Sequence, residues 1–272
     1  MTAPREQRRV FGEVADAYDD VRPGYPAEIL DLITAYAGRA PRTVAESGAG
    51  TGKGTALLRG LGVPLTCVEP DPAMAALLTR RFDGDDLVSV VVSRFEDWTP
   101  PPGGVDLLAS AQAWHWVDRT RRSRLAAEAL APGGVLAVFG HDFGFVDARL
   151  RAELDAVYLQ HAPEIADQPG RPVNTRHPGV FHPDELRGSP WFIDVEEQRV
   201  VTVVPYDTAR YLTLLSTFSP HRMLPEQQRS RLHRALADLV DARGGVVEQR
   251  LTTGLCLARR VSRFPPARGH RG

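Results

Sequence analysis

The sequence predicts an α/β fold in which a mostly parallel sheet is flanked by helices. Stretches with strand-like and helix-like patterns alternate over residues 43–139, which is typical of parallel strands joined by right-handed helical crossovers. A glycine-rich turn follows the first strand-like stretch, and an acidic residue ends the second. Ligands of such sheets bind beyond the carboxyl ends of the strands, where both features lie.

Five strands and four helices are expected in the first half of the chain. Residues 27–37 carry apolar side chains at helical spacing. Pro72 suits the first turn of a helix, because its missing N–H costs nothing there. Residues 87–93 are rich in valine, as strands buried on both faces are, and a Pro-Gly-Gly sequence at 132–134 ends the last helix. The expected strands are 43–47, 65–69, 87–93, 105–110 and 135–139, and the expected helices are 27–37, 51–61, 72–82 and 120–130.

The pattern changes after residue 140. Residues 161–190 are rich in Pro, Gly and His and have no clear period, whereas residues 195–204 alternate like a strand. Further helices are expected at 147–160, 207–217 and 225–242, and a final strand at 251–258. The length of 272 residues and the 43% hydrophobic content suit one domain over residues 1–272. We expect a ligand-binding core at 10–140 and a lid at 141–245.

Charge and hydropathy argue against several classes of partner. The net charge is −1, so no overall field attracts nucleic acid or an anionic membrane. No apolar stretch approaches the length of a membrane span, and the N-terminus lacks the apolar segment of a signal peptide. Cys67 and Cys256 lie in strand-like apolar stretches, which favours reduced core residues over a disulfide. We expect a cytoplasmic protein, monomeric or homodimeric, that binds neither nucleic acid nor membrane.

The glycine-rich turn discriminates among three classes of ligand. A phosphate-binding P-loop would need a glycine at Ser47 and a hydroxyl at Gly54. A dinucleotide site would need its third glycine one residue later than Gly52, and Glu46 before the turn would repel a pyrophosphate. Glu46 would instead suit a ligand with an ammonium group. Glu69, which ends the second strand, can accept hydrogen bonds from both hydroxyls of a ribose.

This combination resembles the first two motifs of the class I methyltransferases that depend on S-adenosylmethionine (SAM). Further segments resemble one branch of that family, which includes the trans-aconitate methyltransferase-like enzymes, and they occur in the same order. The matching segments are residues 11–26, 46–52, 69–74, 95–98 (Phe-Glu-Asp-Trp), 111–116 (Ala-Gln-Ala-Trp-His-Trp) and 130–134. The resemblance implies a Rossmann-like, mostly parallel seven-stranded sheet flanked by helices. It also implies an antiparallel final strand and a helical lid formed by the N-terminus and the second half.

The resemblance implies SAM as the cofactor and S-adenosylhomocysteine as the product. Backbone at the three glycines of the turn would pack against the methionine portion, with the ammonium group at Glu46 and the ribose at Glu69. Residues 95 and 96 would contact adenine, and an Arg or Tyr of the N-terminal segment would pair with the methionine carboxylate. A plain tight turn is the alternative reading of the glycines. The expected cofactor-binding residues are Tyr18, Arg22, Glu46, Gly48, Gly50, Gly52, Glu69, Phe95, Glu96 and Gln112.

Residues after the fourth and fifth strands are expected on the acceptor side. His115 and His141 are the candidate catalytic bases, because an imidazole titrates near neutral pH. The alternative for His115 is a structural hydrogen-bonding role. The expected substrate-binding residues are Tyr25, Trp114, Trp116 and Tyr211, for which core packing or the walling off of SAM is the alternative.

No metal site is expected. His161, His177 and His182 match no standard spacing of metal ligands, and no cysteine joins them.

The expected activity is transfer of the SAM methyl group to an oxygen, nitrogen or carbon nucleophile of a small molecule, with a carboxylate or hydroxyl favoured. A sulfonium donor is already activated, so positioning and desolvation can supply most of the rate. Two alternatives stay open: a methyltransferase of peptides or other macromolecules, and a protein that binds SAM without transferring methyl. A nicotinamide-dependent oxidoreductase fails on the glycine spacing.

Overall fold

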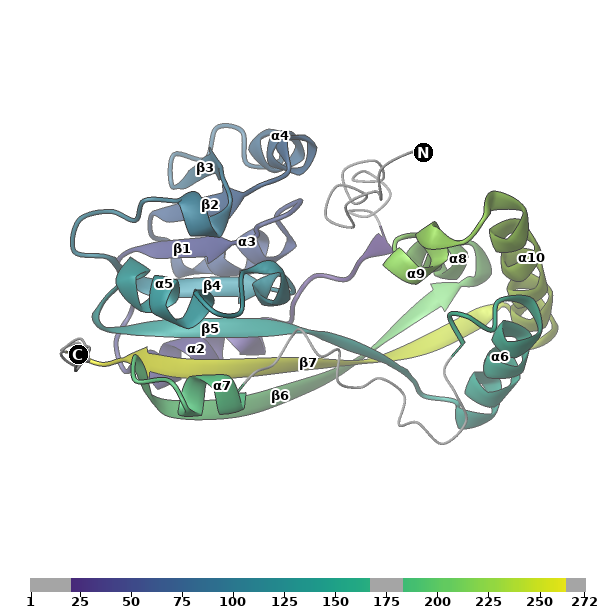
Figure 1. Ribbon diagram of the computed structural model, residues 1–272. Helices are drawn as coiled ribbons and strands as arrows, with labels where there is room; N and C mark the ends of the chain where they lie inside the picture. The colour runs from purple at the N-terminus through teal and green to yellow at the C-terminus, as the bar shows by residue number, and fades with distance from the viewer. Residues whose placement is uncertain (1–20, 167–182, 263–272) are drawn as a thin grey trace, which may run out of the picture. The chain divides into compact units, whose positions relative to one another are not determined.

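The computed structural model describes residues 21–166 and 183–262. Strands and helices alternate over the first half of the chain, and the second half combines helices with the long strands β6 and β7 (Figure 1). The elements are α2 (Glu28–Ala37), β1 (Val44–Ser47), α3 (Lys53–Leu58), η2 (Arg59–Leu61), β2 (Leu65–Glu69), α4 (Pro72–Arg81), β3 (Val88–Val92), η3 (Phe95–Asp97), β4 (Val105–Ala111), η4 (Trp114–Trp116), α5 (Arg122–Ala129), β5 (Leu130–Phe145), α6 (Ala148–His161), α7 (Pro183–Arg187), β6 (Phe192–Asp207), α8 (Thr208–Ser216), α9 (Ser219–Met223), α10 (Glu226–Ala242) and β7 (Val246–Arg260).

The described strands form one seven-stranded sheet in the order β3-β2-β1-β4-β5-β7-β6. Strand β1 pairs in parallel with β2 and β4, β2 with β3, and β4 with β5. Strand β7 runs opposite to its neighbours β5 and β6 (Figure 1). The mostly parallel seven-stranded sheet with flanking helices is thus confirmed. The strand order reverses between β1 and β4, and the carboxyl ends of strands at such a switch point are where open α/β sheets bind ligands.

The chain divides into two compact units. The first unit comprises Met1–Pro23, His141–His177 and Val201–Thr253, and the second comprises Gly24–Gly140, Pro178–Val200 and Gly254–Gly272. Strands β5, β6 and β7 have residues in both units. The expectation of one domain with a core at 10–140 and a lid at 141–245 stays a prediction.

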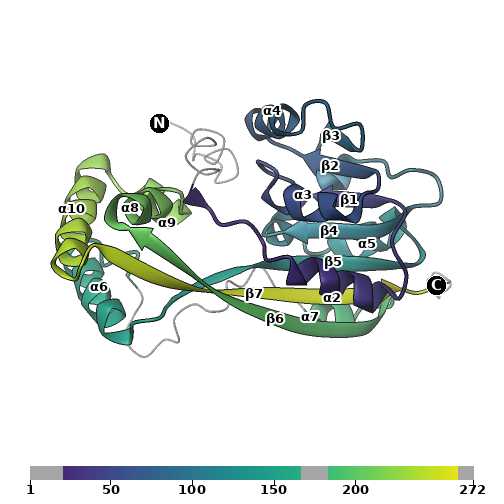
Figure 2. The same cartoon turned by 180° about the vertical axis from the view of Figure 1, so that it is seen from behind.

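The second unit has helices on both faces of its part of the sheet. Figure 1 shows α5 and α7 on one face, and Figure 2 shows α2 and α3 on the other. Successive residues of β4 point to opposite faces, as in any pleated strand. Leu108 packs in the cluster that includes Ala126 of α5, whereas Leu107 and Ala109 pack in the cluster that includes Ile29 of α2. These five side chains are buried, so both faces of the central strands are sealed.

The first unit has a helical core. Helix α10 contributes Leu232, Leu236 and Val240, which are buried and spaced four residues apart, so they form one apolar stripe. Helices α6 and α8 pack against α10. Tyr211 of α8, one of the expected substrate-binding residues, is buried in this cluster, and its neighbour Leu214 lies one turn further along the same face.

Most expected elements are present, with shifted ends. Strand β5 begins at Leu130 and so includes the Pro-Gly-Gly sequence that was expected to separate a helix from a strand. A register irregularity between Val105 and Leu107 lets Leu130 pair with Val105, and Val135 with Leu107. Helices α7 and α9 were not expected, because each is only five residues long. No helix in the described part of the chain combines the length and apolarity that crossing a membrane requires.

Candidate functional site

The glycine-rich turn joins β1 to α3 in a backbone conformation that favours glycine. Gly48, Gly50 and Gly52 have φ angles of 71°, 58° and 93°, in the left-handed region that other residues rarely adopt. A Cβ at Gly48 would also collide with the Cβ of Ala113, which follows β4. The turn after β1 and the loop after β4 are therefore in backbone-level contact at the switch point of the sheet.

Glu69 ends β2 with its carboxylate held in place by backbone amides. Its Oε2 accepts a hydrogen bond from Gly50 N at 2.8 Å, and its Oε1 accepts one from Asp71 N at 2.9 Å. The residue is buried, and this burial raises the pKa of its carboxyl, although both amide hydrogen bonds act against the shift. Each carboxylate oxygen has a second lone pair, so the group can still accept the hydroxyls of a vicinal diol.

Glu46 lies in the middle of the sheet beneath the turn. It is fully buried, and its Oε2 accepts a hydrogen bond from Thr55 Oγ1 at 2.5 Å. Within the described residues, its Oε1 is buried without a hydrogen-bond partner, and a Cβ at Gly54 would collide with that oxygen. Burial and the charge of Glu69 raise the pKa of Glu46, against the effect of the hydrogen bond from Thr55, to about 8. A buried oxygen without a partner is costly, and a cationic ligand would satisfy it.

The η3 turn after β3 carries Phe95 and Glu96. Phe95 is buried, with its ring centroid 6.3 Å from that of Trp114. Glu96 Oε1 accepts a hydrogen bond from Asp118 N at 3.0 Å. The loops after β3 and β4 are thus joined by an aromatic contact and a hydrogen bond.

The loop after β4 begins with a strained residue. Gln112 has a φ angle of 52°, which is rare for a residue with a side chain and is often found at functional sites. Its N–H donates to Phe139 O at 2.8 Å on β5, and the hydroxyl of Tyr25 donates to its Oε1 at 3.5 Å. Trp114 of η4 is buried, whereas Trp116 and His115 are half-buried with their ring centroids 4.7 Å apart.

The second unit brings most of the expected site residues to one edge of its sheet. Tyr25, Glu46, the three glycines, Glu69, Phe95, Glu96, Gln112, Trp114, His115 and Trp116 all belong to this unit. His115 is the only histidine among its described residues.

The remaining expected residues belong to the first unit. The guanidinium of Arg22 donates from Nε to Thr217 Oγ1 at 2.9 Å, and its Cζ lies 4.2 Å from the ring centroid of Phe218. His141 is buried, with its Nδ1 2.9 Å from Thr253 Oγ1. Tyr18 lies outside the described residues, as do His177 and His182.

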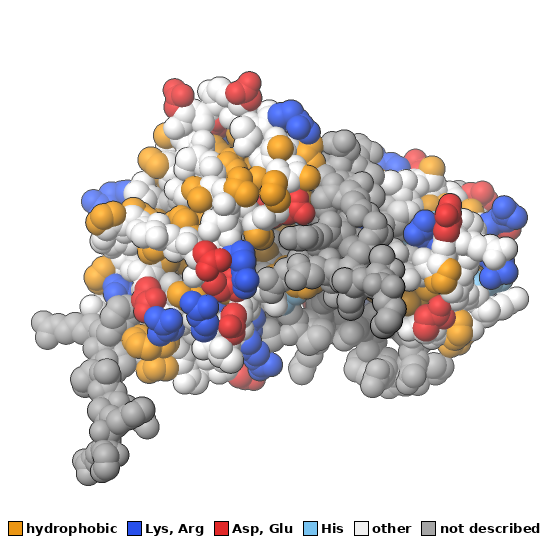
Figure 3. All heavy atoms as spheres, turned by 45° about the horizontal axis from the view of Figure 1, so that its top comes forward, with side chains coloured by type: hydrophobic (Ala, Val, Ile, Leu, Met, Phe, Trp, Pro, Cys, Tyr) orange, Lys and Arg blue, Asp and Glu red, His pale blue; other side chains and the backbone are white. Residues whose placement is uncertain are grey.

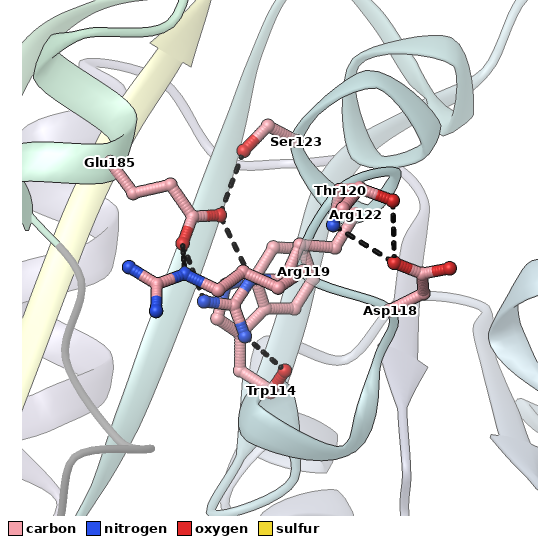
Figure 4. Close-up of polar contacts among 7 residues, drawn as sticks. All are labelled: Trp114, Asp118, Arg119, Thr120, Arg122, Ser123 and Glu185. Carbon is pink, nitrogen blue, oxygen red and sulfur yellow. Dashed lines mark hydrogen bonds and ion pairs between the residues drawn. The ribbon is translucent and has the colours of Figure 1, made fainter.

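The sequence reasoning missed a buried ion pair beside η4. Arg122, the first residue of α5, is 1% exposed and forms two hydrogen bonds with Glu185 of α7 (Figure 4). The two residues are 63 positions apart, so no sequence pattern links them. Thr55, the partner of Glu46, was also missed, although a polar residue on the buried side of a short helix is a usable signal.

This donor set fits SAM. A carboxylate at the end of β2 suits the ribose, a buried carboxylate oxygen without a partner suits an ammonium group, and the left-handed glycines leave the turn without side chains. In the part of the chain described, no three His, Cys, Asp or Glu side chains gather as a metal site would require.

Comparison with known proteins identifies the family. The family model described as "Methyltransferase domain" matches residues 45–138. The uncharacterized methyltransferase Rv3342 of Mycobacterium tuberculosis is 32% identical over 177 residues, which are 65% of this chain and 67% of that protein. The uncharacterized methyltransferase GWCH70_2477 of Geobacillus is 29% identical over 173 residues, which are 61% of this chain and 77% of that protein.

A solved structure supports the fold. A protein of Anaeromyxobacter dehalogenans, described as a type II methyltransferase, superposes with a TM-score of 0.65 at 21% identity, over 89% of this chain and 99% of that one. The sheet order, the glycine turn at its switch point and these relatives agree. The chain therefore belongs to the class I SAM-dependent methyltransferases.

Proposed function

We propose that this methyltransferase acts on a small molecule and that the attacking atom is a carboxylate or hydroxyl oxygen. The observation that carries the proposal is the direct contact between the cofactor turn and the loop that carries His115. Gly48 abuts Ala113, and His115 stands two residues further on, beside Trp116. An imidazole and two indoles next to the cofactor turn suit an enclosed acceptor with an acidic proton.

The cofactor is assigned to specific residues in this proposal. Glu69 accepts the ribose hydroxyls, and Glu46 accepts the ammonium group, directly or through water. Phe95 and Glu96 border the adenine, and the glycine turn together with Gln112 borders the methionine portion. Arg22 and Tyr18 are the candidates for binding the methionine carboxylate. His141 is a second candidate base, and Tyr211 is a candidate for contact with the acceptor.

Little covalent chemistry is then required of the protein. SAM, when bound, supplies a methyl group on a sulfonium that an in-line nucleophile can displace. A carboxylate acceptor is already ionised at neutral pH and needs no base, so the indoles of Trp114 and Trp116 would only orient it and exclude water. A hydroxyl acceptor must lose a proton, which the imidazole of His115 would accept. The role of His115 therefore depends on the acceptor.

The surface charge supports a small acceptor over a nucleic acid. The net charge is −1, and on the face drawn in Figure 3 basic and acidic side chains are interspersed. No single-sign field dominates this face, as one would along a phosphate backbone.

Calorimetric titration tests the cofactor assignments. SAM, S-adenosylhomocysteine and NAD are titrated into the wild type and into the isosteric variant Glu69→Gln. The control is Asp86→Asn, which changes an exposed carboxylate in the loop between α4 and β3. We expect the first two ligands to bind the wild type and the control, Glu69→Gln to weaken both, and NAD not to bind. Equal affinity of Glu69→Gln and wild type for SAM would refute the ribose assignment.

A product-release screen tests the acceptor class. Release of S-adenosylhomocysteine is measured with pools of carboxylic acids, phenols, alcohols, amines, peptides and RNA. We expect turnover with a carboxylic acid, a phenol or an alcohol. Turnover confined to peptide or RNA would refute the proposal. If an alcohol or phenol is methylated, His115→Ala should lose turnover while it still binds SAM. If a carboxylate is methylated, His115→Ala should stay active.

A further inference from the structure

A buried arginine lies directly behind the η4 turn. Arg122 is 1% exposed, and its guanidinium makes three hydrogen bonds to two partners (Figure 4). Its Nε donates to Glu185 Oε1 at 2.8 Å and its Nη2 donates to Glu185 Oε2 at 2.5 Å. Its Nη1 donates to the backbone carbonyl of Trp114 at 3.0 Å. One cation therefore holds a carboxylate of α7 and the first residue of η4 at once.

The carboxylate of Glu185 has further contacts with residues in and just before α5. Its Oε1 also accepts a hydrogen bond from Ser123 Oγ at 3.1 Å, and its Oε2 lies 3.7 Å from Arg119 Nε. A carboxylate and guanidinium joined by two parallel bonds have a defined relative orientation, which a lysine could not provide. The third bond of Arg122, to Trp114 O, is therefore oriented by Glu185.

The same loop is attached to the cofactor side of the site at other points. Gln112 N donates to Phe139 O, Ala113 abuts Gly48, and Asp118 N donates to Glu96 Oε1. These contacts flank η4 on both sides, and the carbonyl held by Arg122 belongs to the residue just before His115.

We infer that the Arg122–Glu185 ion pair positions the η4 turn, so that Glu185 influences the site through Arg122 and Trp114 without touching a ligand. The inference rests on the proposed function, which puts η4 beside the cofactor. It assigns positioning roles to two residues outside the motifs, one of them on α7. Loss of the Glu185 charge leaves the buried guanidinium without its counter-charge and without one of its two acceptors, and the guanidinium then turns away from Trp114 O.

The test uses the full-length protein labelled with 5-fluorotryptophan. The four tryptophans, at 98, 114, 116 and 191, give fluorine resonances that single Trp→Phe variants assign. The variants are Glu185→Gln, the double variant Arg122→Met with Glu185→Leu, and Glu128→Gln as the matched control. The control breaks the Arg124–Glu128 pair, which is exposed and lies on the same helix. Each protein is characterised by its fluorine spectrum, melting temperature and SAM affinity.

A positioning role and a merely structural role give different results. In Glu185→Gln we expect the Trp114 and Trp116 resonances to shift or broaden while that of Trp98 stays, and SAM affinity to fall by about fivefold or more. In the double variant an apolar pair replaces the ions, so the melting temperature should recover, whereas the tryptophan resonances and SAM affinity should not. The control should change SAM affinity by less than about twofold, because exposed pairs contribute little.

Two outcomes would overturn the inference. One is a Glu185→Gln protein whose Trp114 and Trp116 resonances match those of the wild type. The other is a double variant in which resonances and SAM affinity recover together with the melting temperature, since stability alone would then explain the loss. Failure of the proposed function can be told apart from failure of this inference. If the wild type does not bind SAM, the fluorine spectra of the cofactor-free proteins can still be compared, and they test the positioning of η4 without the cofactor.

Discussion

At the scale of single residues, the contact between Gly48 and Ala113 makes a specific prediction. Gly48→Ala should destabilise the protein and weaken SAM binding, because the new Cβ collides with the Cβ of Ala113. Adding Ala113→Gly removes that collision and should recover part of both losses. The remainder, about 1–2 kcal/mol, reflects the left-handed φ of 71° at position 48. Urea unfolding and calorimetry of the single and double variants measure the two terms.

Gly50→Ala is the matched control for this experiment. Gly50 also has a left-handed φ, of 58°, but a Cβ there would meet only Met74 Sδ at 4.0 Å. We expect Ala113→Gly to give no recovery in the Gly50→Ala background. Equal recovery in both backgrounds would show that Ala113→Gly acts by some means other than relieving the collision.

The raised pKa of Glu46 leads us to expect that the protein releases a proton when it binds the cofactor. With its pKa raised to about 8 by burial, Glu46 is mostly protonated at pH 7, and an ammonium group beside it would favour the carboxylate. SAM titrations at pH 7 in buffers of different ionisation enthalpy should therefore reveal release of a fraction of a proton. Glu46→Gln should abolish this release. A wild type that releases no proton would contradict the pairing of Glu46 with the ammonium group.

The same residue has a consequence for stability. Its folded-state pKa lies above the usual value of 4.5, so the folded protein holds the proton more tightly than the unfolded chain does. The stability that this proton contributes is complete below about pH 4.5 and is lost as the pH rises towards 8. In the cofactor-free protein, Glu46→Gln should therefore lose less stability between pH 6 and pH 8 than the wild type, as measured by urea midpoints.

Much of the candidate site follows from sequence because its residues sit next to one another in the chain. The turn at 46–52 follows the end of β1, and Glu69 ends β2. Because β1 and β2 pair in parallel, these two strand ends lie side by side, which brings Glu69 next to the turn. The Arg122–Glu185 pair and the left-handed Gln112 depend on how distant segments pack. No local propensity encodes these contacts, and only the folded chain reveals them.

At the scale of elements, three helices of the first unit share a chain of hydrogen-bonding rings whose central member, His221, is buried. Tyr158 of α6 lies 3.0 Å from His221 Nε2 of α9, and His221 Nδ1 lies 3.1 Å from His233 Nε2 of α10. Burial, together with the charges of His233 and Arg229, lowers the pKa of His221 to about 3. Burial and Arg229 also lower the pKa of His233. The contact between these helices therefore depends on neutral imidazoles.

This chain predicts acid sensitivity of the first unit. The folded-state pKa of His221 lies below the usual value of 6.5, so the unfolded chain binds more protons between about pH 6.5 and pH 3. Stability should fall on acidification through that range, by at most about 1.4 kcal/mol per pH unit for this group. His221→Gln should flatten the dependence of urea midpoints on pH between 7 and 5.

The elements differ in how well sequence predicts them. Helix α4 has Pro72 in its first turn and Asp71 as a cap that accepts from Ala73 N and Met74 N, so local signals define its start. Strands β5 and β7 extend well beyond the stretches expected, to 16 and 15 residues. Where a strand ends is decided by its neighbours in the sheet, which the sequence of the strand itself does not specify. Helix α7 is only five residues long and lies within the segment without periodicity, so it was missed.

At the scale of the whole molecule, the sheet of the second unit depends on the end of the chain. Leu255 and Leu257 of β7 are at most 1% exposed and pack in the cluster that includes Ile33 of α2. A fragment comprising residues 24–140 would expose this apolar surface, so we expect it to be unfolded or insoluble. Circular dichroism and NMR spectra of the expressed fragment measure this, with the full-length chain as the control. A cooperatively folded fragment would contradict the prediction.

Within the described residues, the backbone passes between the two units at four points: after Pro23, Gly140, Val200 and Thr253. Each unit is therefore encoded in several separated stretches of the gene. A single genetic crossover cannot replace one unit and leave the other intact, because any exchanged block would carry parts of both.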